Sequence, residues 1–191
     1  MDALLKPSMA LSQSELDYQL SPSRSAKDAN GTLARMVQAT TKAKCAHGMS
    51  VTQDVVYGLR PRQRLDVFRP AARHGNLPCF VFLHGGFWQE GDKCVSGFAA
   101  ETLGGMGWAY VAVGYTLTPG IALGDLVAEV NDAVEYLSSH AATFGIDPSR
   151  IVLAGHSAGA HLAACVLANI GRPAVSEAIA GAVLISGVYD L

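Results

Sequence analysis

The sequence predicts an α/β fold, in which helices cover both faces of a mostly parallel sheet. Four short and continuously apolar runs, typical of strands buried on both faces, occupy residues 79–83, 109–113, 151–154 and 182–185. Helical patterns separate these runs, and strands that alternate with helices of this length form βαβ units. The chain has 191 residues, half of them apolar, which is enough for one sizeable core.

The first part of the chain, residues 1–50, is polar and is expected to be a helical lead-in segment. Leucines at positions 11, 16 and 20 predict a short helix that ends before Ser21, and a second helix is expected at residues 32–41. Two interpretations stay open for this segment. It is either a frayed terminus or a lid or docking element.

Residues 51–191 are expected to form the α/β domain, which opens with two strands at residues 51–57 and 64–68. Gly58 and Pro61 lie between these strands, so the sequence predicts a hairpin or meander there. Together with the four apolar runs, this gives six strands.

Two helices are predicted on either side of the run at residues 151–154. The first has Asp125 as its expected N-cap, and Gly145 ends the helical region. The second covers residues 158–170 and is stopped by Gly171 and Pro173. The first helix shows apolar residues at helical spacing, namely Leu126, Val130, Ala133, Val134 and Leu137.

Composition excludes several classes of function. Lys and Arg number 14 against 16 Asp and Glu, so the net charge of −2 predicts neither nucleic acid nor anionic lipid as a partner. The four cysteines form no C-x-x-C pair and no zinc-spaced cluster, so no metal site is predicted, and Cys79 and Cys165 are expected to be buried thiols. The sequence shows no signal peptide and no span for a bilayer, which predicts a protein of the reducing cytoplasm. Its oligomeric state is not indicated.

The strongest chemical motif is G-x-S-x-G at residues 155–159, centred on Ser157. It follows a strand and precedes a helix, as a nucleophile elbow requires. Glycines on both sides remove Cβ atoms that would clash in such a tight turn. The helix N-terminus would also stabilise negative charge that develops beside the serine. The alternative is an ordinary structural turn.

A second motif, His84-Gly85-Gly86-Phe87-Trp88, directly follows the strand at residues 79–83. Acyl transfer needs amide donors aimed at the oxyanion of the tetrahedral intermediate. The amides of Gly85 and Gly86 could supply them, together with the amide of Ala158 after the candidate nucleophile. The alternative is a glycine-rich turn beside a buried tryptophan.

The aromatic residues around these motifs are expected to have supporting roles. His84 is expected to orient its own loop by hydrogen bonds, and Phe87 and Trp88 are expected to pack beside the pocket. His156 and His161 flank the serine on the elbow and the following helix, where an imidazole does not naturally point at the serine hydroxyl. Both are interpreted as structural.

The chain resembles the HGGxW branch of the α/β-hydrolases, which contains kynurenine formamidases (arylformamidases) and related carboxylesterases. The segment DYQLSPSR at residues 17–24 is similar to the lead-in of that branch. Five further segments carry the likeness: LDVF at 65–68, HGGFW at 84–88, VAVGY at 111–115, GHSAGAH at 155–161 and SGVYDL at 186–191.

The resemblance implies eight strands, with the acid of a catalytic triad after the seventh and the histidine after the eighth. Six strands are counted here, so neither residue has a matching position, and the α/β-hydrolase fold is expected to be incomplete. The chain is interpreted as a fragment of a full hydrolase, or else as a natural short form. Asp190, which follows the sixth strand, is either the acid or a structural residue near the pocket. The sixth strand is expected to be an open apolar edge.

The resemblance therefore implies a serine hydrolase of a small acyl substrate that needs no cofactor. Ser157 would attack the carbonyl, and Gly85, Gly86 and Ala158 would bind the oxyanion. The reaction would be either conversion of N-formylkynurenine to kynurenine plus formate or hydrolysis of a carboxylic ester. The alternative from another class is a catalytically inert protein that binds a ligand or a partner.

Overall fold

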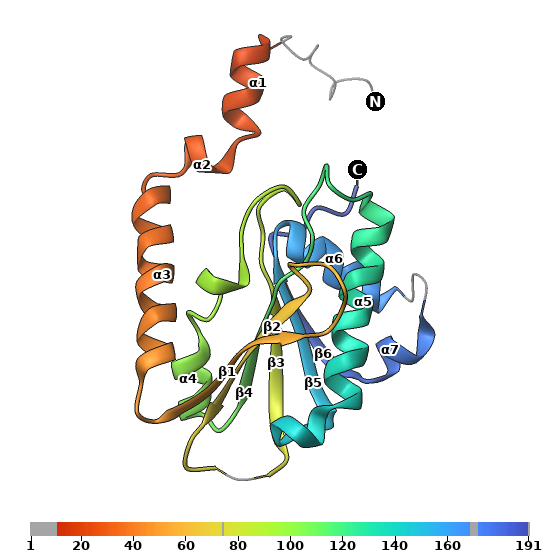
Figure 1. Cartoon of the computed structure of the whole chain (residues 1–191). Coiled ribbons are helices and arrows are strands. Elements are labelled where there is room, and N and C mark those ends of the chain that lie inside the picture. The colour runs from red at the N-terminus through yellow and green to blue at the C-terminus, as the bar shows by residue number, and fades with distance from the viewer. Residues whose placement is uncertain (1–10, 74, 169–171, 191) are drawn as a thin grey trace, which may run out of the picture. The chain divides into compact units, whose positions relative to one another are not determined.

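The computed structural model describes residues 11–73, 75–168 and 172–190 (Figure 1). Its contacts divide the chain into two units, Met1–Arg35 and Met36–Leu191, with the boundary inside one helix.

The first unit contains the helices α1 (Gln13–Gln19) and α2 (Pro22–Ser25) and the start of α3 (Ala29–Cys45). Helix α1 is the short helix predicted before Ser21, and it begins with a capping box in which Ser12 and Glu15 cap each other. Helix α3 contains the predicted second helix but extends beyond it at both ends. The lid or docking role of this segment stays a prediction.

The second unit is built on a six-stranded sheet, ordered β1-β2-β4-β3-β5-β6. Strands β1 and β2 pair antiparallel, as do β2 and β4, whereas β3 pairs parallel with β4 and β5, and β5 with β6. This arrangement confirms the predicted fold class and the hairpin. The strands are β1 (Met49–Val56), β2 (Arg64–Pro70), β3 (Leu77–Leu83), β4 (Ala109–Val113), β5 (Ile146–His156) and β6 (Ile179–Ile185).

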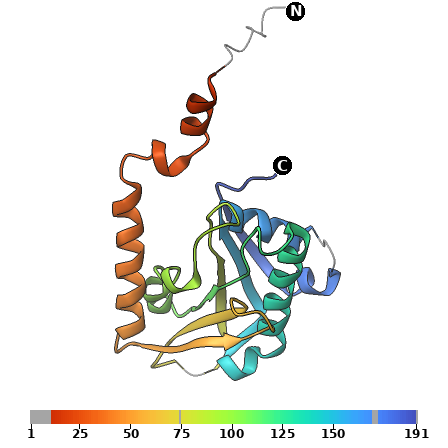
Figure 2. The ribbon, with the colours of Figure 1, turned by 45° about the horizontal axis from the view of Figure 1, so that its top comes forward.

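Alternate residues of each strand point to opposite sides of the sheet, and helices cover both of these faces. One face packs Val67, Val81 and Leu153 against α5 (Leu123–Ser139), α6 (Ala158–Leu167) and α7 (Pro173–Glu177). These helices lie together on one side of the sheet (Figure 2). The other face packs Phe82 and Tyr110 beside α4 (Ala100–Gly105). The two-sided burial explains why β3 and β4 are apolar without interruption.

Two sequence expectations need correction, and a third is confirmed. Helix α5 begins at Leu123 with Ala122 as its N-cap, so the prediction of Asp125 as the N-cap is wrong, and its carboxylate lies inside the first turn instead. Cys79 is buried as expected, but Cys165 is only partly buried. Gly145 has a left-handed φ of 59° and ends the short helix η2 (Ala141–Phe144), as predicted.

Helix α6 begins where predicted and ends at Leu167, and its expected stop at Gly171 lies outside the described residues.

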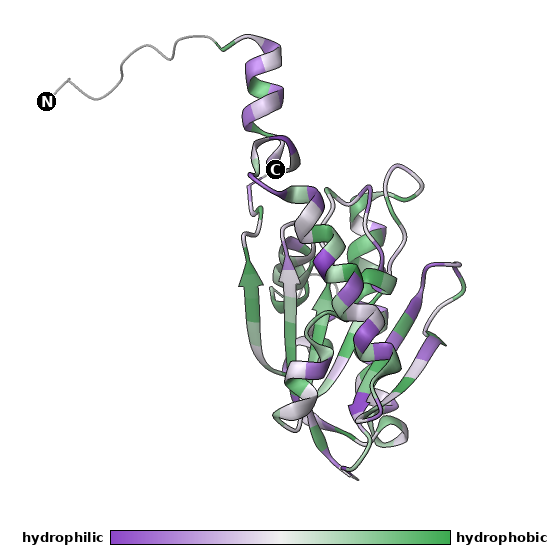
Figure 3. Cartoon of the chain, turned by 90° about the vertical axis from the view of Figure 1, so that its left-hand side faces the viewer, coloured by the Kyte–Doolittle hydropathy of each residue, from purple (hydrophilic) through white to green (hydrophobic). Residues whose placement is uncertain are grey.

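Strand β6 forms one edge of the sheet and is almost entirely hydrophobic (Figure 3). Val183, Leu184 and Ile185 are 41%, 39% and 45% exposed, which confirms the expected apolar edge. Across residues 11–73, 75–168 and 172–190, none of the helices combines the length and the apolar character that a bilayer crossing needs.

Candidate active site

The two candidate loops meet because β3 and β5 are parallel neighbours in register. Leu83, the last residue of β3, lies opposite Gly155 in β5. The chain therefore leaves both strands at their carboxyl ends, on the same side of the molecule. Parallel α/β sheets place their functional loops at the carboxyl ends of the strands.

Ser157 lies at the sharp turn between β5 and α6. Its φ of 52° and ψ of −117° fall in a region that residues other than glycine rarely adopt. The Ser157 amide donates to the Ile185 carbonyl over 2.8 Å, and its carbonyl accepts from the His161 amide over 3.1 Å. These bonds hold the strained residue between β6 and the first turn of α6.

Close packing at the two flanking glycines fixes this turn. A Cβ atom on Gly155 would lie 2.2 Å from the Gly159 carbonyl oxygen, and one on Gly159 would lie 2.2 Å from the Leu83 carbonyl oxygen. No side chain fits at either position without moving backbone. Helix α6 can therefore start directly against the ends of β3 and β5.

The loop after β3 lies beside the serine. A Cβ atom on Gly85 would be 3.3 Å from Ser157 Cβ and 2.8 Å from His156 Nδ1. Gly86 has a φ of 122°, which side chains rarely tolerate, and its amide follows that of Gly85 directly. The structure thus brings together the residues that the two sequence motifs singled out.

Three amide groups at this place donate no hydrogen bond to any described residue. They belong to Gly85 and Gly86 in the loop and to Ala158, the first residue of α6. The first amides of a helix have no partner within the helix, so Ala158 is available on general grounds. These amides can donate hydrogen bonds to a ligand oxygen that carries negative charge.

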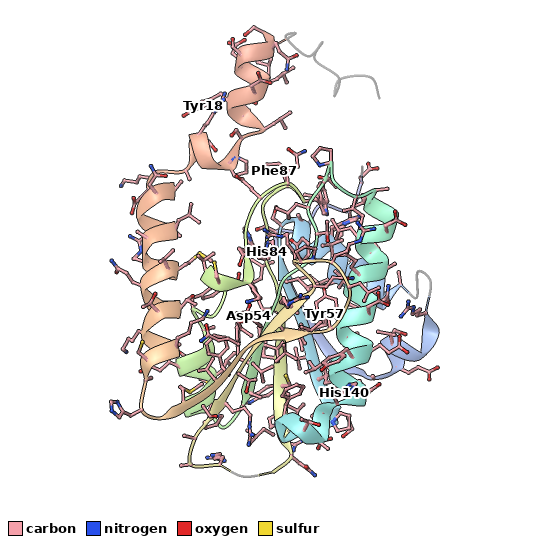
Figure 4. The ribbon with its side chains drawn as sticks, in the orientation of Figure 1. Tyr18, Asp54, Tyr57, His84, Phe87 and His140 are labelled. Carbon is pink, nitrogen blue, oxygen red and sulfur yellow. The ribbon has the colours of Figure 1, made fainter. Side chains whose placement is uncertain are left out.

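His84 is hydrogen-bonded to its own loop, and its role in orienting that loop stays a prediction. It is 5% exposed, and its Nδ1 lies 2.8 Å from the Gly85 carbonyl oxygen, so Nδ1 carries the proton and donates there. Burial lowers the pKa of His84 to about 4, and the imidazole is therefore neutral at pH 7. Figure 4 shows His84 at the carboxyl end of the sheet, below the loop that carries Phe87.

Tyr115 is a residue that the sequence analysis did not single out for a role. Its ring stacks on His84 with centroids 4.2 Å apart, and its hydroxyl donates to the His84 carbonyl over 2.6 Å. Burial raises the pKa of the phenol, which stays a donor. The only sequence signal was its place at the end of VAVGY, because hydrogen bonds to main-chain carbonyls leave no motif.

The two aromatic residues after the glycines behave differently from each other. Trp88 packs against the core and meets His161 edge-on, with ring centroids 5.2 Å apart. Phe87 is 46% exposed and projects from the loop. Burial lowers the pKa of His161, and its imidazole has no hydrogen bond to Ser157, which agrees with a structural role.

The described residues supply no hydrogen-bonded general base for the serine. Within residues 11–73, 75–168 and 172–190, no histidine or carboxylate is hydrogen-bonded to the Ser157 hydroxyl. Asp190 is exposed in the segment after β6. Across the same described residues, no group of three or more His, Cys, Asp and Glu side chains could hold a metal ion.

A buried ionic cluster, which the sequence did not predict, lies around Asp66 on β2, and strands β4 and β3 separate β2 from β5. Asp66 is fully buried and contacts Lys93 at 2.6 Å and Lys44 at 2.9 Å, and Lys93 also pairs with Asp54 at 2.7 Å. Burial raises the pKa of the Asp66 carboxyl, but the two ammonium groups outweigh burial and lower it below its ordinary value. The cluster borders a polar cavity of about 320 Å³ that does not include Ser157.

Comparison with known proteins places this geometry in a family. The family model described as BD-FAE matches residues 65–173, which is more than half of the chain. The chain belongs to the BD-FAE family. The match includes both the loop at residues 84–88 and Ser157.

This BD-FAE family member is 37% identical to a kynurenine formamidase from Danio rerio over 187 residues, which cover 95% of this chain and 62% of the fish protein. It is 35% identical to an isoprenylcysteine α-carbonyl methylesterase from Arabidopsis thaliana over 117 residues, 61% of this chain and 27% of the plant protein. A solved structure of a candidate thioesterase from Silicibacter matches with a TM-score of 0.75 and 31% identity, over 93% of this chain and 65% of that one.

These findings confirm the α/β-hydrolase fold and show that the chain is similar to kynurenine formamidases and esterases. The chain spans 62% of the length of the fish formamidase.

Proposed function

We propose that the protein is a serine hydrolase of small acyl substrates, with Ser157 as its nucleophile. The observation that carries the proposal is the position of Ser157 on a strained turn beside three amides, those of Gly85, Gly86 and Ala158, that have no partner among the described residues. Strain of this kind costs about 1–3 kcal/mol and persists mainly where function needs the geometry. The relatives whose names state formamidase or esterase activity support the same reaction class.

In this reaction the Ser157 oxygen attacks the substrate carbonyl carbon while its proton passes to a general base. The carbonyl oxygen becomes an oxyanion, to which the three free amides donate. Collapse of the intermediate breaks the bond to the amine or alcohol, which leaves with a proton, and water then releases the acid from the acyl-enzyme. No described residue is assigned as the base or as its orienting acid.

For the substrate, we propose N-formylkynurenine, which would give kynurenine and formate. The formamidase relative supports this choice because its similarity extends over 95% of the chain, including the helical lead-in. A carboxylic ester is the second candidate, since the plant methylesterase is similar to this chain over 117 residues.

The cysteines of the described structure are free thiols, so we place the proposed reaction in the reducing cytoplasm.

The test compares turnover of N-formylkynurenine and of a short p-nitrophenyl ester by the full-length protein. Ser157→Ala should lower both rates by about a thousandfold or more, because the nucleophile is lost. Ser139→Ala, at an exposed position on α5, is the matched control and should leave both rates unchanged. Retained activity in Ser157→Ala would reject the nucleophile. A negligible formamidase rate beside a good esterase rate would reject the formamide substrate and keep the ester.

A further inference from the structure

The direction of a main-chain N–H is fixed when the C=O of the preceding residue, which shares its peptide plane, is held by a hydrogen bond. In a trans peptide the C=O and the following N–H point in opposite directions. Fixing the His84 carbonyl therefore fixes the direction of the Gly85 N–H, and fixing the Gly85 carbonyl fixes the Gly86 N–H. Each of these carbonyls has a side-chain donor of its own.

The two donors form a relay from the core to the loop. Tyr115 Oη donates to the His84 carbonyl over 2.6 Å, and His84 Nδ1 donates to the Gly85 carbonyl over 2.8 Å. The rings of Tyr115 and His84 also stack, 4.2 Å apart and within 13° of parallel. Tyr115 is fully buried at the end of β4, next to the end of β3, so the relay starts from a rigid part of the sheet.

Tyr115 is itself held through its main chain. Arg62 Nε donates to the Tyr115 carbonyl over 2.9 Å, and an Nη atom of Arg62 donates to the Gly91 carbonyl over 2.6 Å. Gly91 lies against the His84 ring, because a Cβ atom there would be 2.5 Å from His84 Nδ1. Arg62 therefore ties the far end of the loop to the strand end that carries Tyr115.

We infer that Tyr115 is a positioning residue, which aims the amides of Gly85 and Gly86 at the oxyanion through the His84 carbonyl and imidazole. The inference rests on the proposed function. Tyr115 is fully buried and its hydroxyl bonds to His84 rather than to Ser157, so its loss should weaken stabilisation of the transition state and leave substrate binding intact.

Tyr115→Phe tests the inference, and the fold supplies a matched control. Tyr110, like Tyr115, is fully buried, and its hydroxyl donates over 2.5 Å to the carbonyl of Ser96, which does not belong to residues 84–91 of the loop. We expect Tyr115→Phe to lower kcat about tenfold or more with KM within about twofold, and Tyr110→Phe to change kcat by less than about twofold. Affinity for a trifluoromethyl ketone, which forms an oxyanion on Ser157, should fall with kcat.

Equal kcat values for the two variants, at comparable melting temperatures, would overturn the inference. If Tyr115→Phe does not fold, Arg62→Met replaces it, with Arg64→Met as control, since Arg64 donates only to carbonyls of the β1–β2 hairpin. An unchanged kcat in Arg62→Met would then overturn the inference, and a lowered kcat with unchanged KM would support it. Failure of the proposed function shows separately, as activity that survives Ser157→Ala.

Discussion

The packing at Gly159 gives the sharpest prediction about stability. On helix propensity alone, Gly159→Ala should stabilise the protein by about 0.4–1 kcal/mol. The structure predicts the opposite sign. The new Cβ atom would lie 2.2 Å from the Leu83 carbonyl oxygen and 2.5 Å from that of His84, about 1 Å too close for van der Waals contact. Both obstacles are backbone and cannot rotate away.

Overpacking of this kind costs about 1–3 kcal/mol, so the net loss for Gly159→Ala should be about 1–2 kcal/mol. The new Cβ atom would also displace the His84 carbonyl, and with it the amide of Gly85 in the same peptide group. Gly159→Ala should therefore lower kcat by about tenfold or more as well.

Gly124→Ala is the matched control. Gly124 is likewise the second residue of a helix, and a Cβ atom there meets nothing within 4 Å. Urea unfolding should show a lower midpoint for Gly159→Ala and an unchanged or higher midpoint for Gly124→Ala, with similar m values. If Gly159→Ala were as stable as the wild type while the control behaved as expected, the close approach would be refuted.

Two further predictions concern buried ionisable groups. Since the pKa of His84 is about 4 in the folded protein and about 6.5 in the unfolded chain, the unfolded chain binds more protons between these values. The free energy of unfolding should therefore fall by up to about 3 kcal/mol as pH drops from 6.5 to 4. Urea unfolding at several pH values should show a weaker pH dependence for His84→Gln than for the wild type. The same pH dependence in both proteins would contradict the burial argument. Asp66→Asn should cost about 3 kcal/mol at pH 7, because two lysines lose a buried partner, whereas Asp54→Asn, 72% exposed, should cost less than about 1 kcal/mol. Similar midpoints for these two variants would contradict the account of the cluster.

The sequence predicted the buried strands better than the exposed ones. Strand β4 has the predicted bounds, because every one of its residues is buried and apolar. Strand β5 begins at Ile146, five residues before the predicted start. The sequence missed this start because residues 147–150 are exposed or half-buried and lack an apolar pattern. Helices α4 and α7 have six and five residues, too few to show a helical period.

The site divides in the same way. Ser157, Gly85 and Gly86 could be found because tight turns and close approaches restrict the residue types that fit. Tyr115 and Arg62 could not, because they act on carbonyl groups that every residue possesses. Asp125 failed as an N-cap because the helix has three further residues at its start, Leu123 to Asp125.

The most direct test of the central claim is a crystal structure of the full-length protein after reaction with a fluorophosphonate. The account predicts phosphorus bonded to Ser157 Oγ. It also predicts a phosphoryl oxygen at hydrogen-bond distance, about 2.7–3.1 Å, from the amide nitrogens of Ala158 and at least one of Gly85 and Gly86. A label on another residue, or a phosphoryl oxygen that faces away from these amides, would contradict it.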